Sequence, residues 1–252
     1  EALLRLIPKP RFIRTALAEF PSLDDASRTV NAILTAGIVP VALELMDETA
    51  IACIEAAMHL GLPLDIEALL ILETDGSNEA AVLDEIEVAA RICRENGARN
   101  VAVARTEAER GALWRARRAV SPSLARKAPN KLGEDITVPR TAIPEAVRRI
   151  KAVSARHGLP VVVFGHAGDG NLHPNILFDR RDPQQWAAVE QMAAEIFAIS
   201  LALGGALSGE HGVGALKRPY LAQALGPLSI EIQRRIKAAL DPLEIMNPGK
   251  GL

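Results

Sequence analysis

The sequence is poor in cysteine and aromatic residues, and it has no large excess of either charge. Cys53 and Cys93 are its two cysteines and lie far apart in segments with helical patterns, so neither a disulfide framework nor a Cys-x-x-Cys metal knuckle is expected. This cysteine usage favours a reducing cytoplasm. Lysine and arginine number 29 against 31 acidic residues, with no basic tract, which argues against nucleic acid as a partner.

Long apolar runs and nucleotide-binding motifs are also missing. The longest apolar stretches, Ala32–Leu43 and Phe197–Leu207, are too short for a membrane span and are broken by Gly or Pro. No G-x-G-x-x-G follows a predicted strand, and neither a P-loop nor a G-x-S-x-G motif occurs. The chain begins at Glu1 without Met or leader, so we expect a targeting segment or a whole upstream domain to precede it.

Apolar runs of strand length alternate with longer segments of helical period. The connections are short, which favours an α+β sandwich over a helical bundle. We expect the helix over 106–127 to be interrupted at Ser121-Pro122. Residues 3–7 are predicted to form a short strand or an entry segment. The predicted helices cover 22–36, 48–60, 79–96, 106–127, 144–157, 183–203 and 228–240, and the other predicted strands cover 38–45, 68–74, 98–104, 135–139, 159–164 and 171–178.

The glycine-rich stretch 165–175 contains two histidines at a suggestive spacing. If Asp169-Gly170 form a two-residue hairpin loop, His166 lies directly opposite His173, with Cβ atoms roughly 4.5–5.5 Å apart. Two such imidazoles can hold one metal ion, and Asn175 points to the same face. The alternative is two unrelated histidines in a loop.

A second glycine-rich stretch, 204–214, places Glu210 beside His211. Its glycines let the backbone approach a ligand closely, so Glu210 is a candidate third metal ligand and His211 a candidate acid–base group. The alternative is a flexible connector with a solvated Glu-His pair. Arg117 belongs to a basic cluster next to Trp114 that can hold a carboxylate, although such a run is more often a solvated helix face.

Three motifs, G-H-A-G-D-G-N-L-H-P-N, S-G-E-H-G-V-G and N-P-G-K-G, occur in this order. Together they resemble the carboxy-terminal half of the FAD-linked 2-hydroxy acid oxidoreductases, the group of the vanillyl-alcohol oxidase superfamily that includes the glycolate oxidase large subunit, D-lactate dehydrogenase and D-2-hydroxyglutarate dehydrogenase. The resemblance implies an α+β fold with a ferredoxin-like antiparallel sheet covered by helices. Residues 1–240 would form the substrate, or cap, domain, and residues 241–252 a tail that returns to the FAD domain.

The same resemblance implies a role for each candidate residue. His166, His173 and Glu210 match the ligands of a divalent metal, which could be Zn, Fe or Mn. His211 matches the base. Three further residues match substrate-binding positions: Arg117, Ser121 and Asn175. Asn247 and Lys250 lie in the tail that contacts the flavin domain in relatives. The lysine that the family places before Glu134 is replaced here by Gly133, with Lys131 displaced.

The implied activity is the oxidation of a small 2-hydroxy acid to a 2-oxo acid, with hydride transfer to FAD. FAD would be held mainly by an amino-terminal domain absent from this chain, so the chain alone would be inactive. Further implied partners are electron-acceptor subunits or a second copy, and the implied location is cytoplasmic or peripheral to the inner face of the membrane. The residues also allow a metal-dependent hydrolase or a non-catalytic ferredoxin-like binding module.

Overall fold

The computed structural model describes residues 3–251 and divides the chain into two compact units. The first unit runs to Arg126 and also contains His166–Gly168, and the second contains 127–165 and 169–251. Among the described residues, no helix combines the length and apolarity that crossing a membrane requires.

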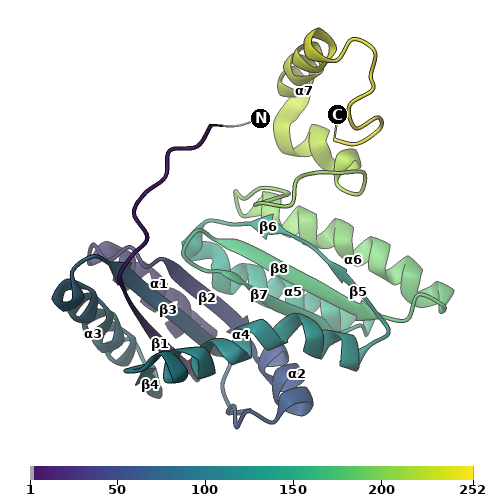
Figure 1. Ribbon diagram of the computed structural model, residues 1–252. Coiled ribbons are helices and arrows are strands. Elements are labelled where there is room, and N and C mark those ends of the chain that lie inside the picture. Colours follow the sequence, from purple (N-terminus) through teal and green to yellow (C-terminus); the bar gives the residue numbers. More distant parts are fainter. Residues whose placement is uncertain (1–2, 252) are drawn as a thin grey trace. The chain divides into compact units, whose positions relative to one another are not determined.

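The first unit is built on a four-stranded sheet in the order β4-β1-β3-β2, with every pair antiparallel. Helices α1 and α3 pack on this sheet and on each other (Figure 1). This arrangement is ferredoxin-like, which confirms the predicted fold class. The strands are β1 (Phe12–Phe20), β2 (Ala42–Asp47), β3 (Ala68–Gly76) and β4 (Asn100–Val103), and the helices are α1 (Leu23–Thr35), α2 (Glu48–Met58), α3 (Glu79–Glu95) and α4 (Glu107–Lys127).

Local signals explain why the helix bounds agree closely with the predicted ones. The Ser22 side chain accepts a hydrogen bond from the backbone N–H of Asp25, and Asn78 caps α3 in the same way. Gly37 and Gly97 follow the ends of α1 and α3 with φ of 83° and 98°, a backbone conformation that favours glycine.

The structure decides two predictions in this unit. Residues 3–7 are an entry segment and not a strand, and the first strand is β1, which pairs with both β3 and β4. The predicted interruption of the helix at Ser121-Pro122 is wrong, because α4 continues through Pro122. A proline removes only one helical hydrogen bond, and the buried neighbours Val120 and Leu124 hold the helix on both sides of it.

The second unit contains a sheet in the order β7-β8-β5, with the short strand β6 also pairing with β8. Helices α5 and α6 pack against each other, and α6 also contacts β8 and β6. Helix α7 begins earlier than predicted and bends at Gly226, whose φ is 76°. The strands are β5 (Asn130–Gly133), β6 (Ile136–Thr137), β7 (Val161–His166) and β8 (Asn171–Phe178), and the helices are α5 (Ile143–His157), α6 (Pro183–Ala202) and α7 (Leu221–Leu240), with short 3-10 turns at η1 (Arg140–Ala142) and η2 (Arg218–Tyr220).

Candidate functional site

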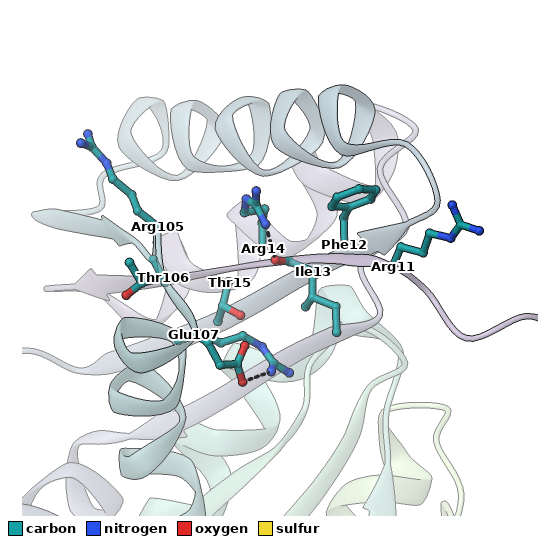
Figure 2. A pocket seen from close by; sticks show the side chains of 10 residues that line it. Arg11, Phe12, Ile13, Arg14, Thr15, Arg105, Thr106 and Glu107 are labelled. Atoms are coloured by element: carbon teal, nitrogen blue, oxygen red, sulfur yellow. Dashed lines mark hydrogen bonds and ion pairs between the residues drawn. The ribbon is translucent and has the colours of Figure 1, made fainter.

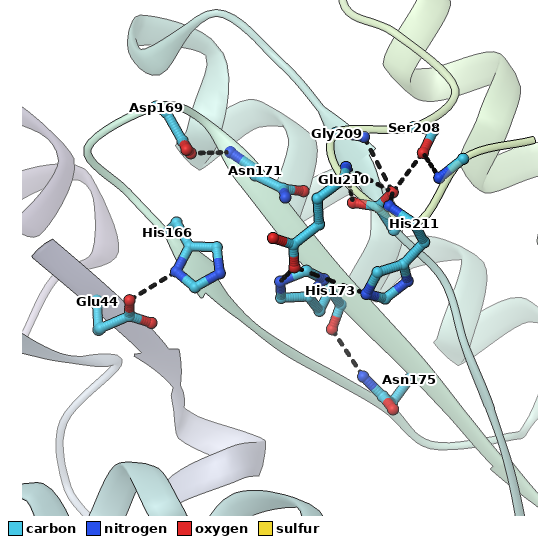
Figure 3. Close-up of polar contacts among 12 residues, drawn as sticks. Glu44, His166, Asp169, Asn171, His173, Asn175, Ser208, Gly209, Glu210 and His211 are labelled. Carbon is cyan, nitrogen blue, oxygen red and sulfur yellow. Dashed lines mark hydrogen bonds and ion pairs between the residues drawn. The ribbon is translucent and has the colours of Figure 1, made fainter. Parts of the chain in front are cut away.

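Two imidazoles and a carboxylate meet in the second unit. Glu210 Oε1 lies 3.5 Å from His173 Nε2 and 3.6 Å from His211 Nε2, and the two rings stack with their centroids 5.3 Å apart (Figure 3). His173 comes from the buried strand β8, whereas Glu210 and His211 come from the loop that follows α6. The structure therefore brings these three predicted site residues together.

The hairpin that carries His166 and His173 has a different register from the predicted one. Its turn contains four residues, Ala167–Gly170, instead of two. A Cβ on Gly165 would lie 2.9 Å from Leu172 Cα, and the rings of Phe164 and His173 are 5.6 Å apart, so Phe164 is the residue opposite His173. The predicted direct pairing of His166 with His173 is wrong.

His166 is the last residue of β7. It lies two residues after Phe164 along the strand, and side chains two residues apart point to the same face of a sheet. His166 therefore lies on the same face of β7 as Phe164.

Asp135 holds the loop that carries Glu210 and His211. Its carboxylate is fully buried and accepts hydrogen bonds from the Ser208 hydroxyl at 2.6 Å and from the backbone N–H groups of Gly209, Glu210 and His211 at 2.9–3.1 Å. Burial raises the pKa of this carboxyl, but the hydrogen bonds and the charge of Lys217 outweigh burial and lower the pKa to about 2. Asp135 is therefore ionised and fixes the position of the loop.

One carboxylate oxygen of Asp135 and one ring nitrogen from each of His173 and His211 lie within 4.8 Å of one another, so these three residues could hold a metal ion. The Asp135 carboxylate, however, already accepts four hydrogen bonds from the loop. The Glu210 side chain, in contrast, is about half exposed and lies close to both histidines. This exposure favours Glu210 over the buried Asp135 as the carboxylate ligand.

Lys217 contacts Asp135 and is almost fully buried. Its ammonium group donates to the Asp135 carbonyl at 2.6 Å and lies 3.8 Å from Glu134 Oε2. Burial raises the pKa of Glu134 to about 7 despite the charge of Lys217, and the neighbouring Asp135 also raises it. Between β5 and β6 the neighbouring carboxyls of Glu134 and Asp135 thus have pKa values shifted in opposite directions.

A second carboxylate cluster lies in the first unit, where Glu44 on β2 is 7% exposed. Glu44 Oε2 accepts a hydrogen bond from Arg117 Nε at 2.8 Å, and Glu44 Oε1 lies 2.6 Å from His166 Nδ1 (Figure 3). The predicted metal ligand His166 and the predicted carboxylate-binding Arg117 therefore share one buried carboxylate. Glu44 was not a predicted site residue, because nothing in the sequence of β2 distinguishes this glutamate from a structural acid.

The other predicted site residues differ in their burial. Asn175 is buried on β8, donates to the His173 carbonyl at 2.9 Å, and packs against Gly133, where a Cβ would lie 2.9 Å from Asn175 Oδ1. Ser121 is exposed on α4. Asn247 and Lys250 are exposed in the tail after α7, where the Lys250 N–H donates to the Asn247 carbonyl.

A separate hollow of about 280 Å³ in the first unit is lined by several arginines (Figure 2). Arg14 is paired there with Glu79, and Arg110 with Glu73 and Glu107. Arg11 and Arg105 point away from each other (Figure 2). The hollow therefore does not gather its positive charges on one ligand position, and it is a weaker candidate than the histidine cluster.

Similarity to known proteins identifies the family of the chain. The family model for FAD linked oxidases, C-terminal domain, matches residues 9–251. The chain is similar to the glycolate oxidase subunit GlcD of Bacillus subtilis, with 42% identity over 250 residues that cover 99% of this chain and 53% of that subunit. It is also similar to a D-lactate dehydrogenase of Anaerostipes hadrus, with 32% identity over 99% of this chain and 54% of that enzyme. The chain thus spans about half the length of these curated relatives.

Solved structures share the fold at low identity. p-Cresol methylhydroxylase with substrate bound has a TM-score of 0.74 and 14% identity, over 97% of this chain and 53% of that one. The 4-ethylphenol oxidase from Gulosibacter chungangensis has a TM-score of 0.69 and 17% identity, over 98% of this chain and 55% of that one. By the family match and the similarity to the GlcD subunit, this chain belongs to the FAD linked oxidases, as their C-terminal domain.

Proposed function

We propose that this chain is the substrate domain of a metal-assisted, FAD-dependent 2-hydroxy acid dehydrogenase of the glycolate or D-lactate type. The names of the similar proteins support the substrate class, because glycolate and D-lactate are both small 2-hydroxy acids. The observation that carries the proposal is the position of Glu210 Oε1 between the Nε2 atoms of His173 and His211. Such a group can hold a cation and a proton acceptor side by side.

The proposed metal ligands are His166, His173 and Glu210. Two imidazoles and a carboxylate suit Zn²⁺, Fe²⁺ or Mn²⁺, so the donor chemistry fits a divalent ion of this kind. The 2.6 Å contact between His166 Nδ1 and the buried Glu44 carboxylate supports its inclusion, because histidines that bind metals commonly have a carboxylate partner at their other ring nitrogen. A divalent ion at these ligands would polarise the substrate's 2-hydroxyl group.

The remaining roles are assigned to residues of the chain. His211 takes the proton of the 2-hydroxyl group, and its 57% exposed side chain leaves the ring accessible to a small substrate. Arg117 binds the substrate carboxylate through a charge-assisted hydrogen bond, with Ser121 and Asn175 as further contacts. The chemistry that bound FAD would supply is that of a hydride acceptor for C2 of the substrate.

We further propose that FAD is held mainly by a separate domain of the complete protein, with Asn247 and Lys250 contributing from this chain. Their exposed places in the tail support contacts with groups outside the described residues. The cytoplasmic location, the electron-acceptor subunits and a homodimer stay predictions.

The test uses His173→Ala in the flavin-containing holoenzyme, with His59→Asn as a control at an exposed histidine outside the site. We expect the wild type and the control to contain about one equivalent of divalent metal and to show flavin reduction by a 2-hydroxy acid. His173→Ala should lose both while keeping its flavin. Normal metal content and turnover in His173→Ala would disprove the site, and a wild type whose flavin no 2-hydroxy acid reduces would favour the hydrolase.

A further inference from the structure

Glu44 connects two residues that the proposed function uses for different purposes. Its Oε1 lies 2.6 Å from Nδ1 of His166, a proposed metal ligand, and its Oε2 accepts from Nε of Arg117, the proposed carboxylate-binding residue. All three residues belong to the first unit. Each oxygen of one buried carboxylate is therefore engaged with a different functional side chain.

A neighbouring glutamate shows what a purely structural carboxylate does in the same setting. Glu73 on β3 is also 7% exposed and lies on the same sheet face, since Ala42 pairs with Glu73 and Glu44 with Ile71. Glu73 accepts hydrogen bonds from Arg110 and Trp114 of α4. Both glutamates thus anchor α4 to the sheet, but only Glu44 also contacts a histidine of the candidate site.

The contact with Nδ1 has a chemical consequence for His166. A histidine whose Nδ1–H donates to a carboxylate presents the lone pair of Nε2 to a metal ion, and the carboxylate makes that nitrogen a stronger ligand. The bond to Arg117 Nε fixes the plane of the guanidinium group in the same way. A single carboxylate can therefore set the tautomer of one side chain and the orientation of the other.

We propose that Glu44 is a positioning residue that holds His166 in its metal-binding tautomer and orients Arg117 for the substrate carboxylate. The proposal rests on the proposed function. It predicts that cation binding and substrate binding depend on the same buried side chain, although Glu44 itself contacts neither ligand.

The test is Glu44→Gln in the flavin-containing holoenzyme. A carboxamide has one acceptor oxygen and one donor NH₂ group, so glutamine cannot accept from both His166 and Arg117. Three quantities are measured: the Kd for Mn²⁺ added to metal-free enzyme, the ¹⁵N spectrum of the His166 ring, and the KM for a 2-hydroxy acid. Glu73→Gln is the matched control, since it removes an equally buried carboxylate that anchors the same helix.

We expect Glu44→Gln to raise the Kd for Mn²⁺ by about tenfold to hundredfold, to give a mixed tautomer signal for His166, and to raise the KM. Glu73→Gln should leave all three unchanged. A Kd within twofold of the wild type overturns the proposal, whatever the KM. If Glu44→Gln does not fold, Glu44→Asp keeps the charge but shortens the side chain, and the same Kd criterion applies.

The two proposals fail in different ways. If His173→Ala abolishes Mn²⁺ binding while Glu44→Gln does not change it, the metal site stands and the role of Glu44 is wrong. If the wild type binds no Mn²⁺, both proposals are wrong.

Discussion

His173 and His211 stack with their planes inclined by only 14°, and both of their Nε2 atoms face the same oxygen of Glu210. One ring is buried in a strand and the other is exposed on a loop. This difference in exposure suits a division of roles, in which the rigid ring binds a cation and the accessible ring exchanges a proton with substrate.

The first prediction separates these roles. Glu210→Gln should lower the metal content of the holoenzyme, because a neutral amide is a weaker ligand than a carboxylate. His211→Gln should keep the metal but reduce kcat by about 10²–10⁴-fold, because glutamine cannot transfer a proton. Metal analysis and steady-state kinetics on the same samples distinguish the ligand role of Glu210 from the base role of His211. An equal loss of metal in both variants would show that His211 is a ligand instead of a base.

The second prediction concerns Asp135 and acid stability. Its folded pKa of about 2 lies below the ordinary value of 3.8, so its contribution is complete above about pH 4 and is lost as the pH falls toward 2. The contribution to the free energy of unfolding is on the order of 2 kcal/mol. Urea unfolding from pH 2 to 5 should show this slope in the wild type and a reduced slope in Asp135→Asn. Asp84→Asn, at an exposed position on α3, should keep the slope.

The third prediction concerns Glu134, whose shift has the opposite sign. Its folded pKa of about 7 lies above the ordinary value of 4.5, so its contribution is complete below about pH 4.5 and is lost as the pH rises through 7. Glu134→Gln should remove this loss, which is on the order of 3 kcal/mol. The free energy of unfolding is compared between the wild type and the variant at pH 5 and pH 8. A difference between the two proteins that does not change with pH would contradict the raised pKa.

The fourth prediction tests the register of the hairpin. A Cβ on Gly165 would lie 2.2 Å from the Asn171 carbonyl oxygen, so Gly165→Ala must displace backbone and should destabilise the chain by about 1–3 kcal/mol. Gly168 lies in the turn of the same hairpin and would meet nothing closer than 3.5 Å, at the Leu43 side chain. Gly168→Ala should therefore cost about 0.5 kcal/mol or less. Thermal unfolding of both variants provides the comparison.

The helices were predictable because their signals are local. Ser22 and Asn78 cap helices that begin within one residue of the predicted positions, and glycines follow the same helices where they end. The strands were less predictable. β1 lacks a regular alternation of apolar and polar residues because it is a central strand, and β5 is a four-residue strand that depends on β8 for its pairing.

The sequence by itself determined most helix positions, the alternation of strands and helices, and the two glycine-rich motifs that contain His166, His173, Glu210 and His211. These depend on residues close together in the chain or on a period of two or 3.6. Only the tertiary structure decided the hairpin register, because the number of residues in a turn is set by how the two strands pack. It also identified Asp135 and Glu44 as the carboxylates that hold the site residues. Asp135 lies 76 residues from His211, and Glu44 lies 122 residues from His166, so no local pattern could have paired them.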